Sequence, residues 1–311
     1  MPTPEKFVFV VGAPRSGTAW LQLLLSQHPD VASCQETHIF SSYMQSLFQS
    51  ELRFASDERG VGLSRVVDEE DFVRLCKEFA LSAVDQITRN HTNGHGKIFV
   101  EKTPAHVHYY QNILRLFPEA FFIEIVRDPR AMVASMRAVD FGNWTTSGVI
   151  QNCHRWKKSI RDGLSLEAGA SHHRRVKYED LLHDTERVLS ELFEFIGEKP
   201  DRSDISVWAE NVSLSKLRSG GGPENVPWDM NREPQNFYRK GDAVGWKKEL
   251  SKADVSLIER LVSSEMDELG YEKSDQGQRG VGRIIVYSII TKIGDFLESL
   301  GRTLRWYRSK L

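Results

Sequence analysis

Short apolar runs alternate with longer helical patterns along the first 180 residues of the chain. Residues 7–11 form a continuous, β-rich apolar run that ends at Gly12, as a buried parallel strand does. Similar runs predict three further strands, at residues 97–100, 120–126 and 174–178. Apolar positions at helical spacing predict helices between these strands: one that includes residues 20–25 and ends near His28-Pro29, and others at residues 71–90, 107–117, 129–138 and 148–167.

This alternation of strands and helices fixes the expected fold class. Consecutive parallel strands need crossover connections, and helices in those connections cover both faces of the sheet. We therefore expect an α/β protein with three layers, a central and mainly parallel sheet between two layers of helices. A chain of 311 residues is long enough for one such domain with appendages.

The pattern changes after Tyr178. Leu189, Leu192 and Ile196 predict a helix that ends at Gly197. Residues 219–236 are rich in Gly, Pro and Asn and predict a long loop, which we interpret as a lid over a functional site. A further helix is expected at residues 252–269.

The last part of the chain forms a separate segment. We divide the chain into a main domain, residues 1–273, and a tail, residues 274–311, which begins with a polar, Gly-rich linker. Within the tail, apolar residues at helical spacing predict an amphipathic helix at residues 283–308: Ile285, Ile289, Ile293, Phe296, Leu300 and Leu304. Such a helix packs on the body, joins a second subunit in a homo-oligomer, or lies on a membrane surface; the sequence leaves these open.

Charge and cysteine content indicate which partners and which cellular compartment to expect. The formal net charge is −2 and the pI is about 6.6, so no bulk electrostatic attraction favours nucleic acid. Three scattered cysteines make neither a disulfide framework nor a zinc site. The first residues lack a basic segment followed by an apolar run, so no signal peptide is expected. We expect a cytoplasmic protein.

The loop after the first strand is a candidate anion site. It reads Gly12-Ala-Pro-Arg15-Ser-Gly17-Thr18 and lies between a strand and a helix, where free backbone N–H groups and the helix dipole favour an anion. The two glycines have the Walker A separation, but Thr18 stands where the Walker lysine is expected. The cation lies inside the loop instead, at Arg15.

With Pro14 and Trp20, this loop resembles the 5′-phosphosulfate loop of the sulfotransferases that use 3′-phosphoadenosine 5′-phosphosulfate (PAPS). The resemblance implies a P-loop-like fold and a direct in-line transfer in which Arg15 stabilises charge on the leaving oxygen. It implies that no metal is needed. It assigns the binding of the donor to a continuous set of residues: Arg15, Ser16, Gly17, Thr18, Ala19 and Trp20.

A second candidate anion site follows the strand at residues 120–126. Arg127 ends that strand, Pro129 suits the first turn of a helix, and Ser135 comes about two helical turns later. An arginine and a serine at this separation bind the 3′-phosphate of the donor in the sulfotransferase family, and a guanidinium fork fits a terminal phosphate. The resemblance therefore assigns the 3′-phosphate to Arg127 and Ser135.

Two later segments extend the resemblance to about residue 270. Tyr178, in Val-Lys-Tyr-Glu-Asp, matches a family tyrosine that contacts the adenine. Arg239, Lys240 and Gly241 resemble the family's Arg-Lys-Gly segment, which closes over the 3′-phosphate. The Gly-x-Trp-Lys pattern that follows in the family is matched only approximately, because Ala-Val separates Asp242 from Gly245-Trp-Lys.

An acceptor hydroxyl must lose its proton, so a positioned base is expected. Glu36, in Glu-Thr-His38, matches the base of the carbohydrate and bacterial sulfotransferases. Lys102, in Glu-Lys-Thr-Pro104, matches a lysine that faces the transferring group. The cytosolic branch places its histidine base where this chain has Pro104, which favours Glu36; His38 and His106 are the alternatives.

The sequence thus predicts a sulfotransferase that moves a sulfuryl group from PAPS to a hydroxyl or amine. The acceptor stays open among small aromatic molecules, lipids, carbohydrates and carrier-bound groups. Two other functions are compatible with such a loop. One is a P-loop kinase or nucleotide hydrolase, for which the Walker lysine is missing. The other is a nucleotide-binding protein without catalytic activity.

Overall fold

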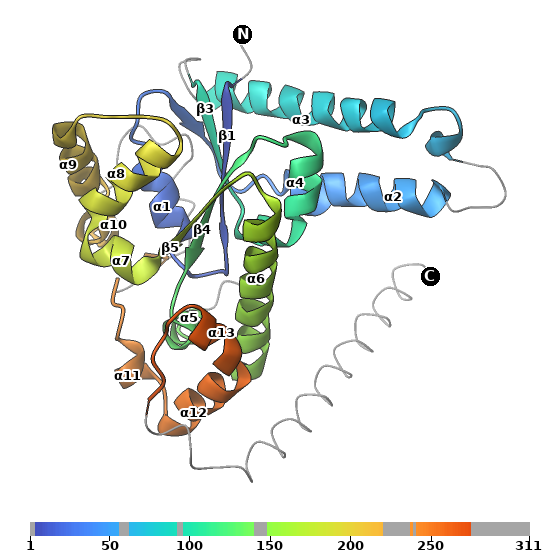
Figure 1. Cartoon of the computed structure of the whole chain (residues 1–311). Helices are drawn as coiled ribbons and strands as arrows, with labels where there is room; N and C mark the ends of the chain where they lie inside the picture. The colour runs from blue at the N-terminus through green and yellow to red at the C-terminus, as the bar shows by residue number, and fades with distance from the viewer. Residues whose placement is uncertain are drawn as a thin grey trace.

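The computed structural model describes residues 4–55, 62–91, 96–139, 148–219, 237–238 and 241–274. Within these residues five parallel strands form one sheet in the order β2-β3-β1-β4-β5 (Figure 1). The strands are β1 (Lys6–Gly12), β2 (Val31–Ser33), β3 (Ile98–Lys102), β4 (Phe121–Val126) and β5 (His172–Lys177). The prediction of an α/β fold with a central parallel sheet is confirmed.

Alternation along β1 explains why the sheet is buried on both faces. Val8 and Val10 point into one apolar cluster and Phe9 and Val11 into another, and all four are at most 2% exposed. The first cluster packs under α1 (Thr18–Leu25), α7 (Tyr178–His183), α8 (Thr185–Phe195), α9 (Arg202–Asn211) and α10 (Leu214–Arg218). These helices form one outer layer.

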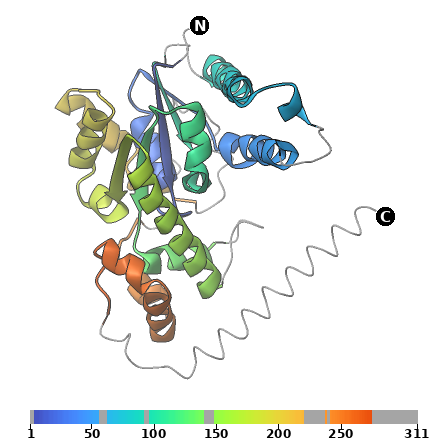
Figure 2. The same ribbon diagram turned by 45° about the vertical axis from the view of Figure 1, so that its right-hand side comes forward.

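The opposite layer contains a π-helical turn, two 3₁₀ segments and four helices. These elements are η1 (Ile39–Met44), α2 (Gln45–Ala55), η2 (Leu63–Arg65), α3 (Glu69–His91), η3 (Pro104–Tyr109), α4 (Tyr110–Leu116) and α6 (Val149–Gly169). Helices α2 and α3 extend well past the sheet, as the two views in Figures 1 and 2 show. The α2–η2–α3 hairpin therefore projects from the body of the molecule.

A third apolar cluster lies beyond the carboxyl ends of the strands. It joins α6 to α5 (Pro129–Arg137), α11 (Trp246–Glu249), α12 (Lys252–Leu261) and α13 (Ser263–Glu268). Buried Arg130 links α5 to α12 because its guanidinium pairs with Asp128 at 2.7 Å and with Glu259 at 2.6 Å. The segment that follows the long loop is thereby attached beside the edge where ligands bind in open parallel sheets.

Several element boundaries differ from the sequence predictions. Tyr178 begins α7 instead of ending a strand, because Lys177 already has the extended conformation of a helix N-cap. The helix expected at residues 252–269 is interrupted at Val262, whose φ of −124° ends α12. The expected amphipathic helix and almost all of the loop at residues 219–236 lie outside the described residues. No helix in the described part of the chain is long and apolar enough to cross a membrane.

Candidate active site

Two glycines shape the loop that joins β1 to α1. Gly12 has a φ of 147°, and a Cβ there would lie 2.3 Å from the Ile125 carbonyl oxygen of neighbouring β4. Gly17 has a φ of 100°, and its Cβ would lie 2.5 Å from Tyr178 Cδ2. Both positions need a residue without a side chain, because both the backbone angles and the space exclude one.

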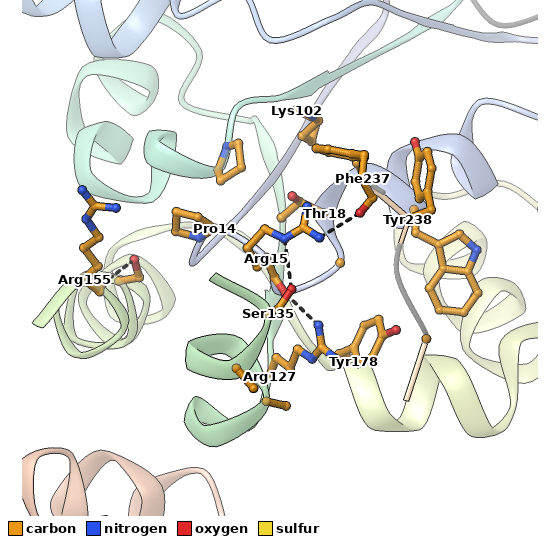
Figure 3. A pocket seen from close by; sticks show the side chains of 18 of the residues that line it. Pro14, Arg15, Thr18, Lys102, Arg127, Ser135, Arg155, Tyr178, Phe237 and Tyr238 are labelled. Carbon is orange, nitrogen blue, oxygen red and sulfur yellow. Dashed lines mark hydrogen bonds between the residues drawn. The ribbon is translucent and has the colours of Figure 1, made fainter. Parts of the chain in front are cut away.

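Arg15 joins the two predicted anion motifs (Figure 3). Its backbone is left-handed, with a φ of 66°. Nε donates a hydrogen bond to Ser135 Oγ at 3.1 Å, and Nη2 donates to the Phe237 carbonyl at 2.8 Å. Arg15 therefore lies beside Ser135, so the loop after β1 and helix α5 form one site.

Arg127 adds a second guanidinium at the end of β4. Its Nη1 donates to the Arg15 carbonyl at 2.9 Å, its Nη2 donates to the Asp242 carbonyl at 3.2 Å, and its guanidinium carbon lies 4.2 Å from the centre of the Tyr178 ring. Its buried Nε has no hydrogen-bond partner among the described residues, and neither does Ser16 Oγ. Buried donors without partners are unusual in folded proteins and fit an anionic ligand.

Trp20 and Tyr178 provide an aromatic wall. Their rings lie 6.0 Å apart in an edge-to-face arrangement, and Trp20 Nε1 donates to the Val212 carbonyl at 2.9 Å. Burial raises the pKa of the Tyr178 hydroxyl, although nearby Arg127 opposes the shift. A neutral phenol beside an indole can pack against a flat heteroaromatic ring.

Glu36, which follows β2, and Lys102, the last residue of β3, form an ion pair. Lys102 Nζ donates to Glu36 Oε1 at 2.6 Å; the lysine side chain is 7% exposed and the carboxylate is 37% exposed. His38 Nε2 lies 3.5 Å from the other oxygen of Glu36. The structure thus brings together Glu36, Lys102 and His38, three of the four residues for which the sequence predicts a catalytic role.

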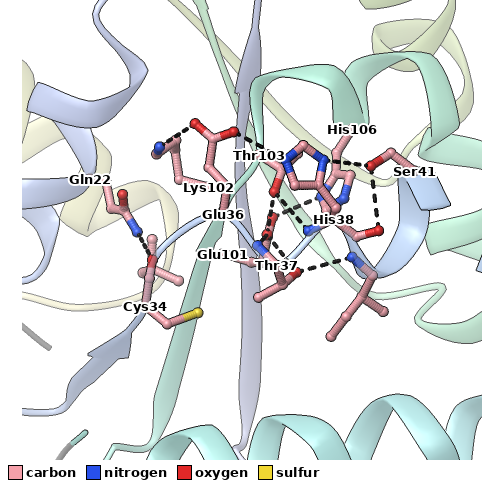
Figure 4. A network of polar contacts seen from close by, with 12 residues as sticks. Gln22, Cys34, Glu36, Thr37, His38, Ser41, Glu101, Lys102, Thr103 and His106 are labelled. Carbon is pink, nitrogen blue, oxygen red and sulfur yellow. Dashed lines mark hydrogen bonds and ion pairs between the residues drawn. The ribbon is translucent and has the colours of Figure 1, made fainter. Parts of the chain in front are cut away.

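The buried carboxylate of Glu101 holds the segment that contains Glu36 and His38 (Figure 4). Glu101 Oε1 accepts hydrogen bonds from Thr37 N at 3.2 Å, Thr37 Oγ1 at 2.9 Å and Thr103 Oγ1 at 2.6 Å. Its Oε2 lies 2.8 Å from His106 Nδ1. Burial alone would raise the pKa of Glu101, but the charge of His106 and these hydrogen bonds lower it to about 2.

This network distinguishes His38 from His106, the two histidines that the sequence left open as alternative bases. His106 is fully buried between Glu101 and the rings of Phe9 and Phe40, and it does not line the cavity described below. His38, with its side chain half exposed, does line it. Of the two histidines considered as bases, only His38 therefore lines the cavity.

A cavity of about 720 Å³ connects these groups. It is lined by most of the residues predicted to bind the donor or to catalyse transfer: Arg15, Gly17, Thr18, Ala19, Trp20, Glu36, His38, Lys102, Arg127, Ser135, Tyr178 and Gly241. Ser16 is buried behind this surface, and Arg239 and Lys240 lie outside the described residues. Within the described part of the chain no group of three His, Cys, Asp or Glu side chains could hold a metal ion.

Sequence reasoning missed several side chains of the cavity. Phe237 places its ring 5.0 Å from the Arg15 guanidinium carbon, although its position before Tyr238 gave no signal of that contact. Arg155 and Ser159 reach the cavity from α6, and Gln35 reaches it from the segment before Glu36. The α6 residues are ordinary polar positions of a long helix, so only the packing of α6 against the sheet reveals them.

The fold and the cavity together define an α/β protein with a P-loop-like fold and a cavity lined by residues that follow the carboxyl ends of its strands. The chain belongs to the sulfotransferase family, whose model matches residues 8–202. It is 30% identical over 200 residues to protein-tyrosine sulfotransferase 2 of Gallus gallus, a match that covers 61% of this chain and half of that protein. It is 24% identical over 304 residues to nodulation protein NoeE of Sinorhizobium fredii, covering 88% of this chain and 68% of that one.

Solved structures show the same fold. The sulfotransferase domain of the Synechococcus PCC 7002 olefin synthase superposes with a TM-score of 0.59 at 19% identity, over 88% of this chain and 98% of that domain. Mouse sulfotransferase SULT7A1, solved as a complex with PAP, superposes with a TM-score of 0.54 at 16% identity, over 88% of this chain and 87% of that protein. At such low identity these likenesses establish the architecture alone.

Proposed function

We propose that this chain transfers a sulfuryl group from PAPS to an acceptor hydroxyl or amine and releases 3′-phosphoadenosine 5′-phosphate (PAP). The observation that carries the proposal is the single cavity in which Arg15, Arg127 and Ser135 meet the Glu36–Lys102 pair. Family membership supports sulfuryl transfer, and the PAP complex of the mouse relative supports this class of nucleotide.

Different residues of the cavity would bind different parts of the donor. Arg127 and Ser135 would hold the 3′-phosphate, because both line the cavity and Arg127 has a buried Nε donor without a partner among the described residues, which suits a dianion. Trp20 and Tyr178 would contact the adenine. The loop from Arg15 to Thr18, at the start of α1, would bind the 5′-phosphosulfate with its backbone N–H groups. We propose residues 1–273 as the catalytic domain.

The bound donor supplies an electrophilic sulfur and a phosphate leaving group. Glu36 takes the proton of the acceptor as the acceptor oxygen or nitrogen bonds to sulfur. Lys102 and Arg15 stabilise negative charge on the sulfuryl oxygens and on the oxygen whose bond to sulfur breaks, and that oxygen leaves with the electron pair. His38, next to Glu36, holds or relays the proton.

The acceptor stays open within the proposal. The relatives' names point to protein tyrosine in one case and to nodulation in another. We expect an acceptor that enters the cavity beside Gln35, His38, Pro104 and Ala105, which line it next to the Glu36–Lys102 pair. We place the enzyme in the cytoplasm, where its three unpaired cysteines persist as thiols.

Calorimetry with PAP, followed by magnesium-free turnover with PAPS and a panel of acceptors, tests the function. Glu36→Gln should lower kcat by about 100-fold or more, the usual contribution of a general base, and leave the Kd for PAP unchanged. Exposed Glu272→Gln is the matched control and should keep full activity. Absence of PAP binding would refute the donor, and turnover with ATP would favour the kinase alternative. PAP binding without transfer to any acceptor would favour the non-catalytic alternative.

A further inference from the structure

Exposed apolar side chains concentrate on the α2–η2–α3 hairpin. Of the ten large apolar side chains that are exposed among the described residues, eight belong to the hairpin or to the turn before it. They are Tyr43, Leu47, Leu52, Phe54, Leu63, Val66, Leu75 and Phe79. Scattered exposed apolar residues are normal, but a concentration on one projecting element marks a contact surface.

Four of these side chains form a continuous surface, which we call the hairpin face. Tyr43 and Leu47 are one helical turn apart, as are Leu75 and Phe79, and the rings of Tyr43 and Phe79 lie 6.5 Å apart. Both views show the hairpin extending from the sheet. Because exposures of 41–58% leave this face in contact with water, its apolar area lacks a partner within the described chain.

The chain itself contains a segment of matching length and pattern. Residues 283–308 carry a stripe of six apolar side chains at helical spacing. As a helix the segment would be about 39 Å long. The eight residues from 275 to 282 add up to about 28 Å of reach from Ser274. The linker and the helix together are therefore longer than a compact chain of this size is wide, which is roughly 50 Å. The segment can therefore reach the hairpin.

Charge favours the same pairing. Residues 45–91, which span the hairpin, contain nine acidic and six basic side chains. Residues 283–311 contain six basic and two acidic side chains. Opposite net charges attract around an apolar contact, and a tether raises the effective concentration of the segment to the millimolar range, which favours its own chain over a second copy.

We propose that residues 283–308 fold as an amphipathic helix that packs its apolar stripe on the hairpin face of the same chain. The contact would cover Tyr43 in η1, only five residues after His38. It would therefore anchor the segment that continues from Glu36 and His38. The inference does not depend on the proposed function, because it concerns a surface outside the cavity.

Hydrogen exchange of the full chain, without nucleotide, tests the contact. The expected result is slow exchange of backbone amides in residues 283–308, at least about ten-fold slower than in the variant Leu300→Asp. That variant should also speed exchange in α2 and α3. The double variant Leu75→Glu with Phe79→Glu should release the C-terminal segment. Thr291→Asp, on the opposite side of the expected helix, is the matched control and should change neither region.

Each other outcome overturns the proposal. Free exchange of residues 283–308 in the wild type would show that the segment does not fold on the body. Protection that disappears on dilution, together with a dimer mass, would show that a second copy supplies the segment. Protection that requires vesicles containing anionic lipid would assign the segment to a membrane surface. Release by Leu300→Asp without any change in α2 and α3 would place the contact elsewhere.

Discussion

Glu101 shares β3 with Lys102 but faces the other side of the sheet, because successive side chains alternate along a strand. The two side chains therefore make different contacts. Lys102 reaches the cavity and binds Glu36, whereas Glu101 fastens Thr37, the residue between Glu36 and His38. We interpret Glu101 as a positioning residue that fixes the segment of Glu36 and His38 relative to β3.

Glu101→Gln should lower kcat and leave the Kd for PAP nearly unchanged, because the lost contacts hold Thr37 and not the nucleotide cradle. It should also alter acid stability in a specific way. The folded pKa of about 2 lies below the ordinary value of 4.5, so the ionised carboxylate stabilises the fold above pH 4.5. That stabilisation is lost as the pH falls from 4.5 towards 2.

Urea unfolding at several pH values measures this effect. The wild type should lose stability more steeply than Glu101→Gln across that window, and the two curves should converge near pH 2. Glu272→Gln serves again as the control and should keep the wild-type slope. Parallel curves for wild type and Glu101→Gln would contradict the depressed pKa, and a weakened PAP affinity would contradict the positioning role.

At the scale of elements, strong periodicity made the strands and the long helices predictable. Residues 7–11 and 120–126 are continuous apolar runs, and both became central strands. The long helix α6 packs on the sheet at Gly163, where a Cβ would lie 1.9 Å from Glu124 Oε1. Nothing in the sequence indicates this contact, because it depends on how far α6 approaches β4.

Gly163→Ala should destabilise the fold by about 1–3 kcal/mol, the usual cost of overpacking. The clash involves Glu124, which is buried and bound to His173 at 3.1 Å and Arg175 at 2.9 Å, so it cannot move away freely. Gly169→Ala, in the same helix, is the control: its Cβ would meet only Tyr110 at 3.5 Å, so it should be neutral or slightly stabilising. Denaturant midpoints of both variants measure the difference.

For the whole molecule, motifs predicted the composition of the site better than its geometry. Arg15, Arg127 and Glu36 were found because each belongs to a short pattern beside a strand. Their mutual arrangement depends on the strand order β2-β3-β1-β4, because Glu36 follows β2, Arg15 follows β1 and Arg127 follows β4. Contacts such as Arg15 with the Phe237 carbonyl arise between residues 222 positions apart, and local patterns carry no record of them.

The cysteines report on the integrity of the whole fold. Cys34, Cys76 and Cys153 are free and at most 6% exposed, and they come from separate parts of the chain. Burial raises the pKa of Cys34 and of Cys153 to about 12, and it also raises that of Cys76. A disulfide reagent at pH 8 should therefore label no thiol in the folded protein and all three after denaturation. Rapid labelling of the native protein would contradict this packing.

The ion pair between Lys102 and Glu36 has a consequence for kinetic order. While the lysine holds the carboxylate, the carboxylate is poorly placed to accept a proton from an incoming alcohol or amine. A sulfuryl group competes for the same ammonium, so entry of the nucleotide frees the carboxylate. On the proposed function, product-inhibition patterns should show that PAPS adds first and PAP leaves last. Random addition would mean that the pair opens on its own.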